Sequence, residues 1–267
     1  MHLLYTDEVN IDPNATDFFV YAGAAIPGDR AGPLAVEIEN LRARHGYQPT
    51  DVLKFNTMER PGHISPEVHR EIKREILEAA ARHEVKLFAS FILHNIATSP
   101  EDARLNEINR ICLHFQYYLG RVGDVGLVLI DTFQDTRLSG HLREKFSVGV
   151  VGLPYSPRYR LDRILGFHVA VVGSSHFCSL VDIVLGSLRY GVNKRNDPAK
   201  REIAKVLVRQ LAPLCIRSPY TGKIEELSIF FSPKTIRVPA YLEAYRELRA
   251  FLAEGGVEAY QEPAGEA

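Results

Sequence analysis

Acidic residues close or interrupt the most apolar runs of this chain, and no other feature constrains its fold as strongly. Asp7 and Glu8 follow a short apolar run near the N-terminus, and Asp131 closes a second run in the middle of the chain. Asp182 lies inside a third apolar run. A carboxylate at the edge of a hydrophobic core is costly unless it is paired, protonated or bound to a cation. Acidic residues at such positions in three distant parts of one chain therefore predict a shared acidic site.

The order of the expected elements indicates the fold class. Apolar runs at 3–6 and 18–24, separated by turn formers at 10–14, predict an antiparallel hairpin. Further strands are expected at 85–93, 126–130, 164–172 and 227–231, and helices at 33–41, 67–83, 105–119, 175–190, 198–211 and 240–254. This order predicts an α/β protein with a mixed sheet that opens with the hairpin and carries helices packed on it. Strands that run in parallel bring their carboxyl ends to one edge of such a sheet, where ligands bind.

The sequence shows no linker clear enough to divide the chain. We therefore expect one domain over residues 1–254, with a C-terminal helical elaboration from about residue 195. The segment 138–157 is rich in Gly and Pro and is expected to be irregular, and 51–55 is either a short strand or an extended loop. Residues 255–267, rich in Gly, Glu and Pro, predict a disordered tail.

Composition limits the classes of partner. The formal net charge is −1, which argues against binding nucleic acid by bulk charge alone, although a local basic stripe remains compatible with it. Three cysteines are too few and too far apart for a disulfide framework, and they indicate reduced thiols. No apolar run approaches the roughly 20 residues that a membrane-spanning helix needs, and the N-terminus does not resemble a signal peptide. These features predict a cytoplasmic protein without a membrane partner and leave the oligomeric state open.

One face of the helix expected from 175 carries small or polar residues. Ser175, Ser179, Asp182 and Gly186 lie at helical spacing on an otherwise apolar element, and the stripe needs a polar neighbour. The strand-end residues Asp7 and Asp131 are the natural neighbours for it. Oxygen ligands of this kind suit Mg²⁺ or Mn²⁺. Each acidic residue taken alone has a structural alternative, such as a turn, a cap or an ion pair with a buried arginine like Arg189.

Four further features have two interpretations each. Glu8 faces away from the site if Asp7 faces it, because neighbouring residues of a strand point to opposite faces. Lys54 either meets a phosphate or lies along an edge with its charge in water. His176 is either a proton shuttle or a partner for the start of its helix. Between 189 and 209 there are seven basic residues and two acidic ones, which indicates a solvated helix face or a track for a phosphate backbone. The basic residues of this run are Arg189, Lys194, Arg195, Lys200, Arg201, Lys205 and Arg209.

Several segments together resemble a known family. They are Tyr5-Thr6-Asp7-Glu8, Phe19-Val20-Tyr21-Ala22-Gly23, Leu53-Lys54-Phe55, Leu129-Ile130-Asp131 and 174–182. Their order over about residues 2–192 resembles the domain of unknown function 3800 family of bacteria and phages. The resemblance implies a ribonuclease H-like fold, with an Asp-Glu pair in the first strand and a Gln-x-x-Asp motif in a late helix. The corresponding positions here are Asp7, Glu8 and Asp182, with Lys54 and Asp131 as further polar positions. The chain differs at Ser179, where the family has Gln, and the loss of that amide affects how a substrate is oriented.

These features lead to a functional hypothesis with one alternative. The hypothesis is a phosphodiesterase or nuclease that uses Mg²⁺ or Mn²⁺ and acts on a nucleic acid or nucleotide. Asp7, Asp131 and Asp182 would hold the ions and Glu8 would assist them, while the substrate would meet Lys54, Ser175, His176 and Ser179. The alternative is a non-catalytic binding or regulatory protein, of the phage-defence or toxin–antitoxin type, that keeps the fold.

Overall fold

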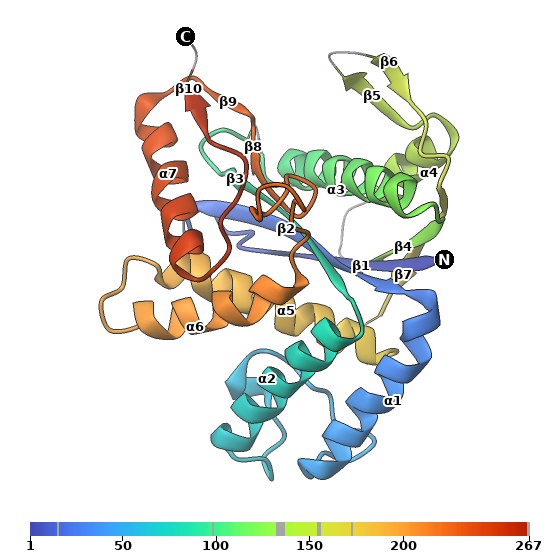
Figure 1. The fold of residues 1–267 in the computed structure, drawn as a ribbon, viewed down its shortest axis with the longest axis vertical. Helices are drawn as coiled ribbons and strands as arrows, with labels where there is room; N and C mark the ends of the chain where they lie inside the picture. The colour runs from blue at the N-terminus through green and yellow to red at the C-terminus, as the bar shows by residue number, and fades with distance from the viewer. Residues whose placement is uncertain (15, 98, 132–136, 154–155, 172, 266–267) are drawn as a thin grey trace.

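A six-stranded mixed sheet forms the centre of the computed structural model, which describes residues 1–14, 16–97, 99–131, 137–153, 156–171 and 173–265 (Figure 1). Its strands, in spatial order, are β7 (Ile164–Ala170), β4 (Gly126–Asp131), β1 (His2–Val9), β2 (Phe18–Pro27), β3 (Lys86–Leu93) and β8 (Ile229–Ser232). β1, β2 and β3 are antiparallel neighbours, β4 runs parallel to β1 and β7 parallel to β4, and β8 runs parallel to β3. The predicted α/β class and the antiparallel opening hairpin are confirmed.

Within the described part of the chain, seven α-helices pack on this sheet and cover both of its faces (Figure 1). One face is covered by α1 (Gly28–Arg44), α2 (Pro66–Arg82), α5 (His176–Lys194), α6 (Arg201–Leu211) and α7 (Pro239–Glu254). The other is covered by α3 (Pro100–Val122) and α4 (Leu138–Ser147). Each face has its own hydrophobic core. No helix in the described ranges combines the length and the apolar character needed to cross a membrane.

The alternation of side chains along β1 decides which residues meet which face. Leu4 belongs to the core under α3, whereas Tyr5 and Val9 pack against the core under α5. Because successive side chains of a strand point to opposite faces, Asp7 lies on the α5 face and Glu8 on the α3 face. The two adjacent acidic residues therefore enter different environments.

The parallel pairing of β1 with β4 brings two acidic residues together. Thr6 pairs with Ile130, so Asp7 and Asp131 follow at the carboxyl ends of neighbouring strands. Asp131 also pairs with Ala170 of β7. The edge of the sheet formed by these strand ends is the edge at which the sequence predicts a site.

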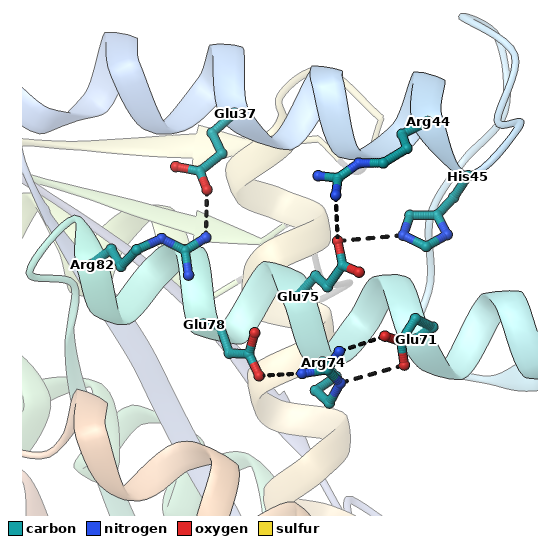
Figure 2. A network of polar contacts seen from close by, with 8 residues as sticks. All are labelled: Glu37, Arg44, His45, Glu71, Arg74, Glu75, Glu78 and Arg82. Carbon is teal, nitrogen blue, oxygen red and sulfur yellow. Dashed lines mark hydrogen bonds and ion pairs between the residues drawn. The ribbon is translucent and has the colours of Figure 1, made fainter.

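An ion-pair network joins α1 to α2 at the surface (Figure 2). Arg82 pairs with Glu37, and Glu75 lies 3.5 Å from Arg44 and 3.4 Å from His45. Within α2, Arg74 pairs with both Glu71 and Glu78. Exposed pairs of this kind contribute only about 0–1 kcal/mol each. Their effect is to fix the position of α2, which in turn contacts the loop that carries Lys54.

The C-terminal part differs from the sequence prediction in two respects. It is not purely helical: β8 agrees with the strand expected at 227–231 and joins the central sheet, and the further strand β9 (Thr235–Ile236) pairs with β10 (Ala264–Gly265). The prediction of a disordered tail is wrong for residues 255–265: Val257 and Ala259 are buried, and the side chain of Gln261 bonds both the N–H and the C=O of Phe231. Residues 266 and 267 lie outside the described residues. The low apolar content of this segment misled the prediction, because two of its apolar side chains, Val257 and Ala259, enter the core while Tyr260 stays exposed.

The segment expected to be irregular is also partly ordered. It contains α4, then β5 (Val150–Leu153) paired with β6 (Ser156–Tyr159). Gly149 precedes β5 with a φ of +94°, and a Cβ there would lie 2.1 Å from the carbonyl oxygen of Tyr159. The glycine therefore permits the close approach of two backbones, so its presence does not indicate a loop.

Candidate acidic site

Three of the predicted acidic residues line one small cavity. Asp7 near the end of β1, Asp131 at the end of β4 and Asp182 in α5 surround a volume of about 70 Å³. Lys54, from the loop after α1, lines the same cavity. We call this feature the acidic cavity; its remaining lining residues are Tyr5, Thr6, Ala170, Cys178 and Val181. The structure thus brings together four of the residues that the sequence singled out.

Backbone donors position two of the carboxylates. Oδ1 of Asp7 accepts a hydrogen bond of 2.7 Å from the N–H of Glu8. Oδ2 of Asp182 accepts one of 2.5 Å from the N–H of Phe55. Lys54 supplies a positive charge, although its Nζ lies 4.0 Å from Oε2 of Glu59 and is thus shared with an acidic residue outside the cavity.

The carboxylates of the cavity destabilise one another's charged forms. The pKa of Asp7 is raised to about 6, mainly by burial and also by the charges of Asp131 and Asp182, while the N–H of Glu8 and the charge of Lys54 oppose this increase. Burial also raises the pKa of Asp182, while the N–H of Phe55, Lys54 and Arg189 lower it. The pKa values of Asp7 and Asp182 are both raised, so the cavity favours a bound proton or a bound cation.

The loop that carries Lys54 is held from two sides. Nζ of Lys73 donates a 2.8 Å hydrogen bond to the carbonyl oxygen of Phe55 and lies 4.3 Å from the centre of its ring. On the other side, Gly186 of α5 lets the ring approach, because a Cβ there would lie 2.1 Å from Cγ of Phe55. The stripe of Asp182 and Gly186 therefore faces this loop. Residues 51–55 form a loop, which resolves the two alternatives left by the sequence.

Lys73 is a contributor that the sequence did not reveal. In the sequence, only its position beside Ile72 and before Ile76 distinguishes Lys73, and both isoleucines are completely buried in the structure. A lysine at such a position is commonly one that extends its charge into solvent. Here its Nζ instead turns to a backbone carbonyl, an interaction that depends on a loop distant in sequence.

The structure corrects the role predicted for Glu8. Its side chain is buried on the α3 face, where Oε1 lies 2.7 Å from the guanidinium of Arg104. Burial raises the pKa of Glu8 to about 7, and Arg104 opposes this increase. Glu8 therefore lies outside the acidic cavity and does not assist Asp7 there. The physical reason is the alternation of side chains along β1, which runs without a bulge through this position.

Ser175, His176 and Ser179 line a neighbouring cavity of about 470 Å³ rather than the acidic one. Oγ of Ser175 accepts a 3.1 Å hydrogen bond from the N–H of Phe177 and caps α5. Nε2 of His176 lies 3.3 Å from Glu39 of α1. Burial and the nearby charge of Arg42 lower the pKa of His176. These contacts favour the interpretation in which Ser175 and His176 complete the start of the helix.

Acidic neighbours compensate most of the basic run. Arg195 is buried and pairs with Asp17 at 2.8 Å. Arg201 pairs with Glu254, and Lys205 pairs with Glu202. Lys200 lies 3.9 Å from Asp197. The run is therefore an ion-paired surface over most of its length, which argues against a continuous phosphate track.

The donor chemistry of the acidic cavity fits a hard divalent cation, since three carboxylates can each supply oxygen ligands. The geometry is less complete. Among the described residues, no group of three or more His, Cys, Asp or Glu side chains is placed to hold one metal ion. Binding an ion between all three carboxylates would require them to approach one another more closely.

Comparison with known proteins adds no assignment. No protein-family model matches the chain, and no match is found among curated proteins. The resemblance described above therefore stays a prediction, and the function must be inferred from the geometry of the molecule.

Proposed function

We propose that this protein is a phosphodiesterase that depends on a divalent cation and acts on a nucleic acid or nucleotide. One observation carries the proposal: Asp7, Asp131 and Asp182, from three separate elements, line one small cavity together with Lys54. The sheet that opens with an antiparallel hairpin and continues with parallel strands supports a ribonuclease H-like fold. That fold is part of the proposal, as the family resemblance implies it.

Each residue of the cavity has a role in this proposal. Asp7, Asp131 and Asp182 would be the ligands of Mg²⁺ or Mn²⁺. A divalent cation bound there would neutralise a phosphate and lower the pKa of a coordinated water. Lys54 would contact a phosphate oxygen as a point charge. The N–H groups of Glu8 and Phe55 keep Asp7 and Asp182 oriented toward the cavity.

Titration calorimetry with Mn²⁺ tests the metal site directly. The wild-type protein is compared with Asp182→Asn, which keeps an oxygen acceptor for the N–H of Phe55 and removes the charge. Asp162→Asn is the matched control, because Asp162 is an exposed aspartate that pairs with Arg160. We expect binding by the wild type and the control and none by Asp182→Asn. Equal binding by all three proteins, or none by the wild type, would contradict the proposal.

A non-catalytic binding protein is the second candidate. It is favoured by the incomplete convergence of the carboxylates among the described residues and by Ser179 at the position where the family has Gln. Rates of hydrolysis of bis(p-nitrophenyl) phosphate and of single-stranded DNA and RNA separate the two. Mn²⁺ binding without turnover of any of these substrates would favour the second candidate.

A further inference from the structure

A larger pocket lies next to the acidic cavity. It has a volume of about 480 Å³ and is formed by α2, α5 and α6 together with the segment at 55–57. This volume lies within the range of pockets that bind small organic ligands. Phe55 links the two sites, because its ring belongs to the pocket lining while its N–H donates to Asp182. We call this feature the basic pocket.

The charge of the basic pocket is one-sided. Arg70, Lys73 and Arg189 contribute to its lining, and none of the described residues that line it is Asp or Glu. Arg70 has an exposed partner in Glu67, at 2.8 Å. Arg189 has no ion-pair partner within the described part of the chain, in contrast to most of the basic run that follows it. Three cations around one hollow create a site for an anion.

Lys73 adds a second observation. It is buried, and its Nζ uses one of three donors on the carbonyl oxygen of Phe55. The pKa of Lys73 is lowered to about 8, mainly by burial and also by the charge of Arg70, while the charge of Asp182 opposes this decrease. An anion between these cations would stabilise the charged form of Lys73 and receive a hydrogen bond from it.

The rest of the lining is apolar with polar groups at intervals. Ile203 and Val206 of α6 line the pocket and are 55% and 46% exposed. Tyr190 offers an aromatic face beside them. Asn56 and Gln210 place side-chain amides in the same lining. Amides can bond the edge of a heterocyclic base, whereas an alkyl chain would leave them unpaired.

We propose that the basic pocket binds a nucleoside monophosphate unit. The phosphate lies among Arg70, Lys73 and Arg189, and the base lies against Tyr190 and Val206 within reach of Gln210. This assignment stands on the lining of the pocket alone. That the bound unit adjoins the phosphodiester cleaved in the acidic cavity is a consequence that rests on the proposed function.

Calorimetry in EDTA tests the proposal without the metal site. The probes are AMP, adenosine, inorganic phosphate and decanoate. We expect AMP to bind at least about 10-fold more tightly than each of the others, because only AMP satisfies both the cations and the apolar wall. Phosphate binding as tightly as AMP would overturn the proposal, as would tighter binding of decanoate or the absence of AMP binding.

Two arginine variants locate the binding. Arg189→Gln is expected to weaken AMP about 5- to 10-fold, since a charge-assisted contact to phosphate is lost. Arg209→Gln is the matched control, because Arg209 is an exposed arginine of α6 outside the pocket lining. The affinity of this variant for AMP should equal that of the wild type. Equal weakening in both variants, or in neither, would place AMP elsewhere and overturn the proposal.

Two further measurements identify the source of the ligand and test the basic pocket independently of the proposed function. The first measurement is competition between AMP and a single-stranded oligonucleotide of about eight nucleotides. If the oligonucleotide displaces AMP, the pocket binds a unit of a nucleic acid strand. If the oligonucleotide does not displace AMP, the pocket binds a free nucleotide. AMP binding that persists in Asp182→Asn, in EDTA, supports the basic pocket even if Mn²⁺ binding and hydrolysis are absent. Failure of the one proposal is therefore distinguishable from failure of the other.

Discussion

The central sheet buries carboxylates on both faces, and the two faces surround them with different partners. On the α3 face, Glu8 pairs with Arg104 at 2.7 Å. On the same face, the carboxylate of Glu107 is 1% exposed; it accepts hydrogen bonds from Ser90 and Ser232 and lies 3.2 Å from Nε of Arg110. On the α5 face, the carboxylates of the acidic cavity share one lysine, and each of Asp7 and Asp182 accepts a single backbone N–H.

This contrast separates structural acids from functional ones. Glu107 is surrounded by donors and is satisfied within the protein, whereas Oε2 of Glu8 has no hydrogen-bond partner among the described residues. Carboxylates that line one cavity repel one another, and a ligand can relieve this repulsion. The sequence shows both kinds as acidic residues near apolar runs. Only the donors contributed by other elements distinguish them.

The largest expected effect is on catalysis, in the acidic cavity. Asp7→Asn should lower Mn²⁺-dependent hydrolysis of bis(p-nitrophenyl) phosphate by at least about 1,000-fold, equivalent to about 4 kcal/mol in the barrier. The reason is that a ligand of the ion is lost while the acceptor for the N–H of Glu8 is kept. Initial rates measured beside Asp162→Asn check this. Activity within about 10-fold of the wild type would contradict a catalytic role of the acidic cavity.

On the α3 face, the largest expected effect is on folding. Glu107→Ala removes the acceptor for Ser90 and Ser232 and leaves Arg110 without its carboxylate. We expect the free energy of unfolding to fall by about 3 kcal/mol, the usual cost of breaking a buried network on one side. Urea denaturation measures the loss. Calorimetry on the folded variant should show unchanged Mn²⁺ affinity; weakened binding would contradict the separation of the two faces.

Because the pKa of Asp7 is raised, the contribution of the acidic cavity to the free energy of unfolding depends on pH. The pKa of Asp7 in the folded state is about 6 against an ordinary value of 3.8, so the folded state holds the proton more tightly than the unfolded state does. The contribution of Asp7 to stability is then fully present below about pH 4 and is lost as the pH rises through 6. In EDTA at pH 8, Asp7→Asn should be more stable than the wild type by about 3 kcal/mol, with no difference at pH 4. Thermal unfolding at both values checks this, and destabilisation at pH 8 would contradict it.

Much of this contrast could be predicted from the sequence. The apolar run that ends in Asp131 predicts the end of β4 correctly, whereas β1 continues past Asp7 to Val9 and only its pairing with β4 ends at Thr6. The alternation rule also anticipated that Glu8 faces away from Asp7. The partners of these acids could not be predicted. Arg104 reaches Glu8 across about 100 residues of chain, and the pairing depends on which side of the sheet α3 covers.

The errors elsewhere have a similar physical origin. The tail after Gly255 has the composition of a disordered segment, yet Val257 and Ala259 are completely or almost completely buried. Other elements form the core around these side chains, so the sequence of the segment itself hardly indicates that it is ordered. Likewise, Gly149 reads as a loop residue in sequence, whereas in the structure it permits close contact with Tyr159.

The smallest expected effect concerns the support of the acidic cavity. Gly186→Ala places a Cβ where the ring of Phe55 lies, so the loop must shift or the helix must yield. We expect a loss of about 1–2 kcal/mol in the free energy of unfolding and weaker Mn²⁺ binding, because the N–H of Phe55 no longer orients Asp182. Gly140→Ala in α4 is the matched control, since nothing lies within 4 Å of its new Cβ. That variant should gain about 0.5–1 kcal/mol from helix propensity and bind Mn²⁺ as the wild type does. If Gly186→Ala loses stability but keeps full Mn²⁺ affinity, the loop supports the core alone, and the orientation of Asp182 does not depend on Phe55.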